Sequence, residues 1–290
     1  AGSETSDSAV LTNAESGEKR GLNTDLNRPV FAILDPVLAA TLPNHQVACG
    51  VSDILMHTME RYFVNIETME ITDSISESLM QTVIYNSRIL LKEPDNYTAR
   101  AEVMWAGSLS HNGLTGCGTG GGDWACHQLE HELGGTYDVA HGAGLAALWG
   151  SWARYVYDAN PERFAQFATN VFEIPCSLDF NKTALAGIEA MEDFFRSIKM
   201  PTSLHDLGLD LTEKEIHDLA FKCSYERYGE NLSGCQITDL LFTRSDRYWQ
   251  PAGSFPYSIN YCRCFLKNPI FIKTSAFLFF PCNLYINVLK

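Results

Sequence analysis

Three histidines occur within fifteen residues of the stretch DWACHQLEHELGGTYDVAHG. His127 and His131 are four residues apart, so on a helix their side chains lie on one face. The glycine pair Gly134 and Gly135 predicts the end of that helix. His141 follows at the start of the next apolar run, from where its side chain can face the first helix. The stretch therefore predicts two successive helices whose imidazoles lie near each other.

A second pair of candidate ligands lies upstream, in VSDILMHTMERYF. Asp53 and His57 have the same spacing of four residues, which again places both side chains on one helix face. Three imidazoles and one carboxylate suit a borderline divalent ion such as zinc or iron(II), and a set without thiolate is typical of catalytic rather than structural sites. One such pair alone is more often a packed or second-shell feature of a helix. The combination of the two pairs favours a metal site.

The rest of the pattern is mainly helical. Apolar residues recur at helical spacing across residues 46–63, around Asp53. Further segments with helical periodicity are Ile71–Leu91, Ala99–Leu109, Gly142–Tyr157, Pro161–Val171, Asn181–Ile198 and Thr212–Lys222. An apolar run closed by Asp-Pro, Pro29–Pro36, predicts a short strand. We expect residues 45–230 to form one helical domain, with residues 1–44 as a separate preceding segment and connector.

The last sixty residues differ from the others. Residues 231–290 contain six Lys or Arg and two acidic residues, in a chain whose formal net charge is -14. Aromatic runs such as FLFFPCNLYINVLK show no steady alternation and no helix caps. We expect this atypical tail not to be native to the helical fold, as would follow from a frameshifted coding end. Resequencing the coding region tests this expectation.

Composition narrows the classes of partner. The acidic net charge argues against nucleic acid or an anionic membrane as the main partner. The nine cysteines have no paired metal-binding spacing, and no apolar run of about 20 residues suggests a membrane span. With no signal peptide, these features predict a cytoplasmic location.

The spaced residues resemble the iron-containing alcohol dehydrogenases, in particular their butanol-dehydrogenase branch. The resemblance rests on Gly50-x-x-Asp53-x-x-x-His57, on His127-x-x-x-His131 and on His141-Gly142, and the stretches GSETSDSAVLTN and PVFAILDP agree with it. It extends to about residue 230. It implies a mainly α fold: the all-helical metal-binding domain of the dehydroquinate synthase-like fold, preceded by a remnant strand of an α/β nucleotide-binding domain.

The resemblance also implies an activity and a set of site residues. The activity is a reversible, NAD(P)H-dependent reduction of an aldehyde to a primary alcohol by a homodimer. The metal is iron(II), with zinc or manganese as alternatives. The implied metal ligands are Asp53, His57, His127 and His141. His131 is implied near the nicotinamide, as a proton relay or as a packing residue, and the residues implied to approach the nicotinamide and its ribose are Gly2, Ser3 and Lys19.

One departure from the family keeps an alternative open. Family members carry a nucleotide-binding domain with a Gly-Gly-Gly-Ser phosphate loop at a helix N-terminus. The Gly120–Gly122 run precedes the histidine helix rather than following a strand, so it is not a substitute. The chain as given is therefore either part of such an enzyme, inactive alone, or a non-catalytic metal-binding helical module or product of a degraded gene. A lyase of the dehydroquinate-synthase type fits the ligand spacing less well.

The remaining histidines are His45, His111, His205 and His217. They show no spacing to a partner residue, which predicts surface or core positions for them.

Overall fold

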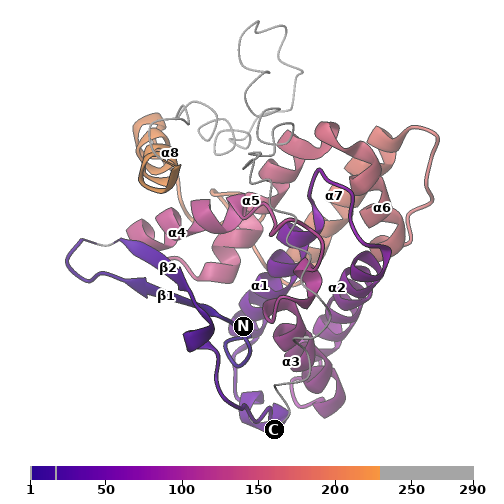
Figure 1. Cartoon of the computed structure of the whole chain (residues 1–290), viewed down its shortest axis with the longest axis horizontal. Coiled ribbons are helices and arrows are strands. Elements are labelled where there is room, and N and C mark those ends of the chain that lie inside the picture. The colour runs from indigo at the N-terminus through magenta and orange to yellow at the C-terminus, as the bar shows by residue number, and fades with distance from the viewer. Residues whose placement is uncertain (1, 17, 229–290) are drawn as a thin grey trace, which may run out of the picture.

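The computed structural model describes residues 2–16 and 18–228, and Figure 1 shows its helices and strands. Within these residues the fold is mainly helical, as predicted, and the two strands form one small sheet. The predicted atypical tail, residues 231–290, lies outside the described residues. No helix in the described part of the chain is both long and apolar enough to cross a membrane.

The helix at the centre of the fold is α1 (Asn44–Tyr62). It packs against α2 (Glu70–Leu90), α3 (Tyr97–His111) and α5 (His141–Val156). Its side chains are buried on nearly every face, which is typical of a core helix rather than of a helix on the surface. Polar side chains in the middle of α1 are consequently enclosed by the neighbouring helices.

Of the remaining helices, α4 (Ala125–Tyr137) and α7 (Phe180–Ser197) pack against α5. The helix α4 lies between α5 and α8 (Glu213–Tyr228), and α6 (Pro161–Phe172) pairs with α7. Helix α6 begins with Pro161 at its first turn, and the Asn160 side chain accepts the backbone N–H of Arg163. These are ordinary signals for a helix start. The eight predicted helices, the histidine helix included, are all present within the described residues, with shifted ends.

The end predicted for the histidine helix is wrong. Helix α4 continues through Gly134 and Gly135 to Tyr137, and it ends at Asp138, which has the left-handed φ of 52°. The glycine at 134 serves packing instead, because a Cβ added there would lie 2.8 Å from Glu130 Oε1 and 2.9 Å from Lys19 Nζ. Gly134 therefore leaves room on the surface of α4 for the ion pair between Glu130 and Lys19, and it does not end the helix.

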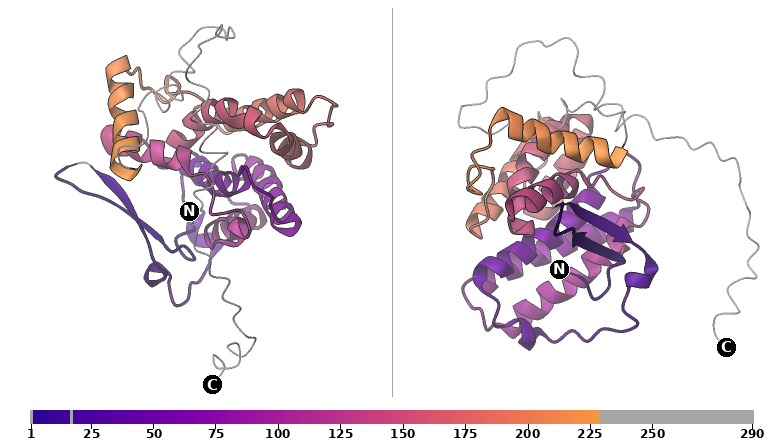
Figure 2. Two further views of the ribbon diagram at one scale, coloured as in Figure 1. Left: turned by 45° about the horizontal axis from the view of Figure 1, so that its top comes forward. Right: turned by 90° about the vertical axis from the view of Figure 1, so that its left-hand side faces the viewer.

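A β-hairpin precedes the helices. Strands β1 (Ser8–Thr12) and β2 (Lys19–Asn23) are antiparallel, with Leu11 opposite Arg20, and β2 lies beside α4 (Figures 1 and 2). The strand predicted at Pro29–Pro36 is not formed. The apolar side chains of that segment are largely exposed, and within the described residues no strand pairs with it. An apolar run becomes a strand only where another strand accepts its backbone hydrogen bonds.

Candidate metal centre

Asp53, on α1, lies at the centre of a cluster of imidazoles. Its Oδ1 atom faces the Nε2 atoms of three histidines, at 3.6 Å for His57, 3.7 Å for His127 and 3.5 Å for His141. Its Oδ2 atom lies 3.5 Å from Nε2 of His111. The structure therefore brings together all four residues predicted as metal ligands, and it adds a fourth imidazole that the sequence did not indicate.

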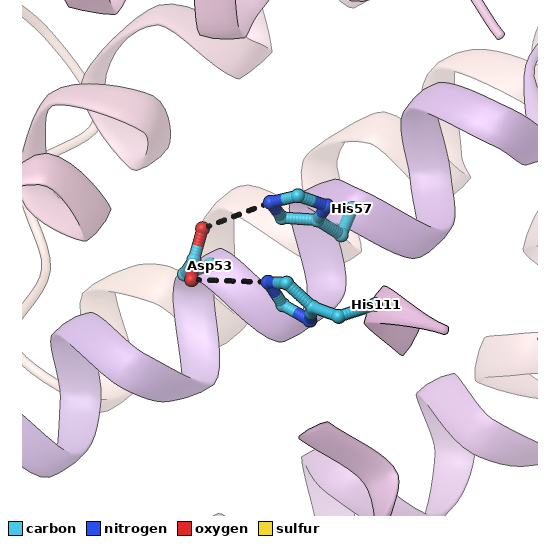
Figure 3. A group of neighbouring side chains, drawn as sticks. All are labelled: Asp53, His57 and His111. Carbon is cyan, nitrogen blue, oxygen red and sulfur yellow. Dashed lines mark ion pairs between the residues drawn. The ribbon is translucent and has the colours of Figure 1, made fainter. Parts of the chain in front are cut away.

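Four helices supply these side chains. Asp53 and His57 lie one turn apart on α1, His127 lies in the first turn of α4, and His141 is the first residue of α5. His111 is the last residue of α3. Figure 3 shows the rings of His57 and His111 one above the other, with one nitrogen of each directed at the Asp53 carboxylate. The site thus depends on how the helices pack and not on a single local motif.

Two buried carboxylates orient the imidazoles of α4 and α5. Glu60 Oε2 contacts Nδ1 of His127, while Glu60 Oε1 accepts the backbone N–H groups of Cys126 at 2.8 Å and His127 at 3.2 Å. In the same way Glu130 Oε2 contacts Nδ1 of His141. Because an ionised carboxylate only accepts hydrogen bonds, each Nδ1 carries a hydrogen, and in the neutral ring the lone pair is then on Nε2. Both lone pairs are directed toward Asp53.

The charges of the cluster follow from burial and from these carboxylates. Burial opposes ionisation of Asp53, but the surrounding histidines outweigh it and hold the pKa of this carboxyl well below its usual range. Burial also disfavours the charged form of His127, but Glu60 and Asp53 outweigh it and raise its pKa to about 9. The pKa of His141 is raised against its burial by Asp53 and Glu130. For His57 burial dominates, and its pKa is well below the usual value. The site therefore favours positive charge near the Asp53 carboxylate.

The donor set fits a divalent cation. Two groups of donor atoms share Asp53, one with His57 and His111 and one with His127 and His141, and within each group the atoms lie within 4.8 Å of one another. The Nε2 atom of His127 is buried and makes no hydrogen bond within the described residues. A buried nitrogen lone pair without a donor is costly unless a cation or proton fills it. Imidazole nitrogens and one carboxylate suit a borderline ion.

His131 lies beside this cluster. It is one turn after His127 on α4, and its ring stacks against that of His141, with centroids 5.8 Å apart and an interplanar angle of 30°. With Glu130 and His141 it forms a third group of neighbouring donor atoms. The structure places His131 next to the predicted metal ligands and not among the imidazoles that face Asp53. Its predicted role as a proton relay stays a prediction.

The residues predicted to approach the nicotinamide lie at two places. Gly2 is buried against His111, and a Cβ added at Gly2 would collide with that ring. Ser3 follows it and is exposed. Lys19, on β2, donates to Glu130 Oε2 at 3.1 Å. The structure thus brings Gly2 to the edge of the site, while Lys19 contacts the carboxylate that orients His141. Binding of a nicotinamide by these residues stays a prediction.

A cavity of about 600 Å³ extends from the cluster. Asp53 and His141 contribute to its wall, and most of the other lining side chains are apolar, among them Val47, Val51, Leu90, Val103 and Met104. Its size is within the ordinary range for small-molecule sites. Glu4, Gln46 and Arg100 line it as well, so the cavity combines largely apolar walls with polar groups besides those of Asp53 and His141.

Three further side chains at the candidate site were not predicted to contact its histidines or Asp53, although the sequence suggested that Glu60 supports the helix of Asp53. Glu130 stands next to His131 in the sequence, so a carboxylate among histidines was a usable signal for an orienting residue. Glu60 lies one turn after His57 and could have been found by the same argument. His111 gave no signal, because its approach to Asp53 depends on the packing of α3 against α1.

A buried carboxylate that faces several imidazoles, without a thiolate and beside a largely apolar cavity, is the set of donors typical of catalytic rather than structural metal sites. Residues 46–240 match the family model described as Fe-containing alcohol dehydrogenase family, C-terminal. The chain belongs to this family, as the resemblance predicted.

Similar proteins from several organisms support the same family. The chain is 38% identical over 216 residues to NADH-dependent butanol dehydrogenase A of Clostridium acetobutylicum, a match that covers 74% of this chain and 55% of that protein. It is 38% identical over 209 residues to NADPH-dependent aldehyde reductase YqhD of Escherichia coli, covering 72% and 54%. The crystal structure of NADH-dependent butanol dehydrogenase A from Thermotoga maritima has a TM-score of 0.76 at 32% identity, covering 83% of this chain and 62% of that one. The chain spans about half the length of the curated relatives it matches.

Proposed function

We propose that this chain is the metal-binding part of an NAD(P)H-dependent alcohol dehydrogenase that interconverts an aldehyde and a primary alcohol. The observation that carries the proposal is the convergence of imidazole Nε2 atoms on the Asp53 carboxylate at the end of an apolar cavity. Relatives whose names specify butanol dehydrogenase or aldehyde reductase support this substrate class. The proposed ligands of the ion are Asp53, His57, His127 and His141.

The proposed ion is divalent. Iron(II) is the first choice, because the matched family is described as Fe-containing, and zinc and manganese(II) accept the same donor types. When bound, such an ion polarises a carbonyl oxygen and stabilises the negative charge that develops on it during reduction. Glu60 and Glu130 hold the Nδ1 hydrogens of His127 and His141, which keeps their Nε2 lone pairs available.

The chain's own residues would prepare the substrate for hydride transfer. The apolar walls of the cavity take up an alkyl chain and exclude water, so that the polar end of the molecule lies toward Asp53 and His141. His131, stacked against His141, is the proposed group that passes a proton to the alcohol oxygen, since a histidine exchanges protons near neutral pH. Gly2, Ser3 and Lys19 are the proposed neighbours of the nicotinamide.

Metal content and turnover together test the proposal. Elemental analysis of the purified chain, after anaerobic addition of iron(II) or zinc, is combined with oxidation of NADH or NADPH in the presence of butanal. We expect about one ion per chain in the wild type and in the control His205→Ala, which alters an exposed histidine paired with Asp210. We expect loss of the ion in Asp53→Ala and in His127→Ala. Equal metal content in all four proteins would contradict the site.

The turnover measurement distinguishes three alternatives: a metal-binding part of a larger dehydrogenase, a chain that is active by itself, and a non-catalytic product. One bound ion without turnover indicates a metal domain that needs a further nucleotide-binding part, which is the reading we propose for the chain alone. One bound ion with turnover shows that this chain suffices to hold NAD(P)H. Absence of both supports the alternative of a non-catalytic module or a product of a degraded gene.

A further inference from the structure

His111 is a buried imidazole at the centre of the site that has no place in the proposed ligand set. It ends α3, its side chain is 4% exposed, and its Nε2 atom lies 3.5 Å from Asp53 Oδ2. The other three imidazoles face the second oxygen, Oδ1. The carboxylate of Asp53 therefore has an imidazole nitrogen on each of its two oxygens.

The hydrogen bonds of the ring decide which nitrogen of His111 carries the lone pair. Nδ1 lies 2.9 Å from the carbonyl oxygen of Gly107 and 2.7 Å from Ser110 Oγ. A carbonyl oxygen only accepts, and the Ser110 hydroxyl itself donates to the Gly107 carbonyl at 2.8 Å. Nδ1 is consequently the donor in both contacts. In the neutral ring Nε2 then presents its lone pair to a carboxylate oxygen. This arrangement of two acceptors is stabilised by a proton on Nε2, which makes a hydrogen bond to Asp53, or by a cation between the two atoms.

Packing fixes the direction of that lone pair. The ring of His57 lies against one side of the His111 ring, with centroids 3.7 Å apart and an interplanar angle of 33° (Figure 3). Gly2 lies against the His111 ring as well, so closely that any Cβ there would collide with it. A ring held in this way cannot turn its Nε2 atom away from Asp53 without moving α3 or the N-terminal segment. The nitrogen is therefore prepositioned, as metal ligands commonly are.

We propose that His111 Nε2 is a fifth protein donor to the ion held by Asp53, His57, His127 and His141. This inference rests on the metal site of the proposed function. One carboxylate and four imidazoles exceed the four ligands of ordinary zinc sites, so the set favours ions that accept five or six ligands, such as iron(II) and manganese(II). His111 thereby makes the site more selective against zinc than four donors would.

Cobalt(II) provides a spectroscopic test that does not depend on turnover. X-ray absorption of the cobalt-loaded wild-type chain counts the imidazoles around the ion, and we expect four. His111→Asn keeps an amide donor for the Gly107 carbonyl and removes Nε2, whereas His111→Phe keeps a ring between Gly2 and His57. Both variants should bind cobalt with three imidazoles, at least about tenfold more weakly, and with the stronger visible absorption of a smaller coordination number. His205→Phe, at an exposed histidine, is the matched control and should behave as the wild type.

Two results would overturn the inference. The first is a cobalt-loaded wild type with three imidazoles, which leaves the proposed metal site intact and removes His111 from it. The second is wild-type affinity in His111→Phe with weaker binding only in His111→Asn, because the ring would then act through packing. A wild type that binds no cobalt contradicts the proposed function itself. Should the variants fail to fold, by circular dichroism with a chelator present, the imidazole count of the wild type decides.

Discussion

Lys19 Nζ lies 3.1 Å from Glu130 Oε2, the same carboxylate oxygen that contacts Nδ1 of His141. Lys19 belongs to the hairpin and Glu130 to α4, and the side chain of Glu130 is fully buried. The ammonium group is thus the cationic partner of the carboxylate that orients a proposed metal ligand. This relationship connects the hairpin to the metal centre through two hydrogen-bonded groups.

Replacing Lys19 by Met should destabilise the metal-free chain by up to about 3 kcal/mol, because a buried carboxylate would lose its cation. Urea unfolding in the presence of a chelator measures the change in the free energy of unfolding. Lys19→Arg is the control that retains the charge. A second variant, Glu130→Gln in the Lys19→Met background, should recover part of the loss. A change below about 0.5 kcal/mol in Lys19→Met would show that the ion pair contributes little.

Replacing Glu60 by Gln should weaken metal binding by about 10- to 100-fold. The Gln side chain has only one acceptor oxygen. It cannot accept both the backbone N–H groups of α4 and the N–H of His127 Nδ1, so the imidazole loses its fixed tautomer and direction. Competition with a chromophoric chelator measures the affinity. The control is Glu102→Gln, which also removes one negative charge, at an exposed position on α3 that does not contact the His127 imidazole. It should leave the metal affinity unchanged.

Gly142→Ala should move His141 and lower metal affinity together with stability. A Cβ at this position collides with the backbone carbonyl of Cys49, so α5 cannot approach α1 as closely. We expect a loss of about 1–3 kcal/mol in thermal or urea unfolding. Gly50→Ala is the matched helix control, since a Cβ there meets no atom within 4 Å. It should be neutral or should stabilise α1 by about 0.5–1 kcal/mol; equal effects of the two substitutions would contradict this account.

Asp123→Asn should stabilise the protein at neutral pH and have little effect below about pH 4. Burial, with a further contribution from Glu60, raises the pKa of Asp123 from 3.8 to about 6. Since the folded chain holds this proton more tightly than the unfolded chain, the wild type loses stability as the pH rises from about 4 to 6. The loss amounts to about 3 kcal/mol at most. Asn can still accept the Ala125 N–H, which Asp123 Oδ1 accepts at 2.9 Å.

The difference in unfolding free energy between Asp123→Asn and wild type, measured with a chelator at several pH values, tests this prediction. Comparing two proteins at each pH removes the contribution of every other titrating group. A difference that stays constant from pH 4 to 7 would show that Asp123 titrates as it does in the unfolded chain.

Local spacing predicted part of the site and tertiary packing decided the rest. The pairs at i, i+4 correctly indicated that Asp53 and His57 share a face of α1. The same spacing on α4 separates two roles, because only His127 faces Asp53 while His131, one turn later, lies against the ring of His141. His111 is 58 residues from Asp53, and no local pattern could place it there.

The fold shows the same division. Helical periodicity located the helices, because each buries an apolar stripe that the sequence displays. The strands were missed because β1 and β2 are short and mostly exposed, so burial leaves no alternation to detect. The strand predicted at Pro29–Pro36 was wrong for the opposite reason. The segment is apolar, but without a neighbouring strand to accept its backbone hydrogen bonds it does not form a sheet.

The donors around Asp53 come from four helices, and they meet only after α1, α3, α4 and α5 have packed together. The helices must therefore assemble before a complete set of ligands exists, and the ion cannot start the collapse of the chain. We expect refolding to proceed at the same rate with or without ion, followed by a separate capture step through the cavity that reaches Asp53. Once captured, the ion joins four helices at a single point, so its main kinetic effect would be to delay their separation.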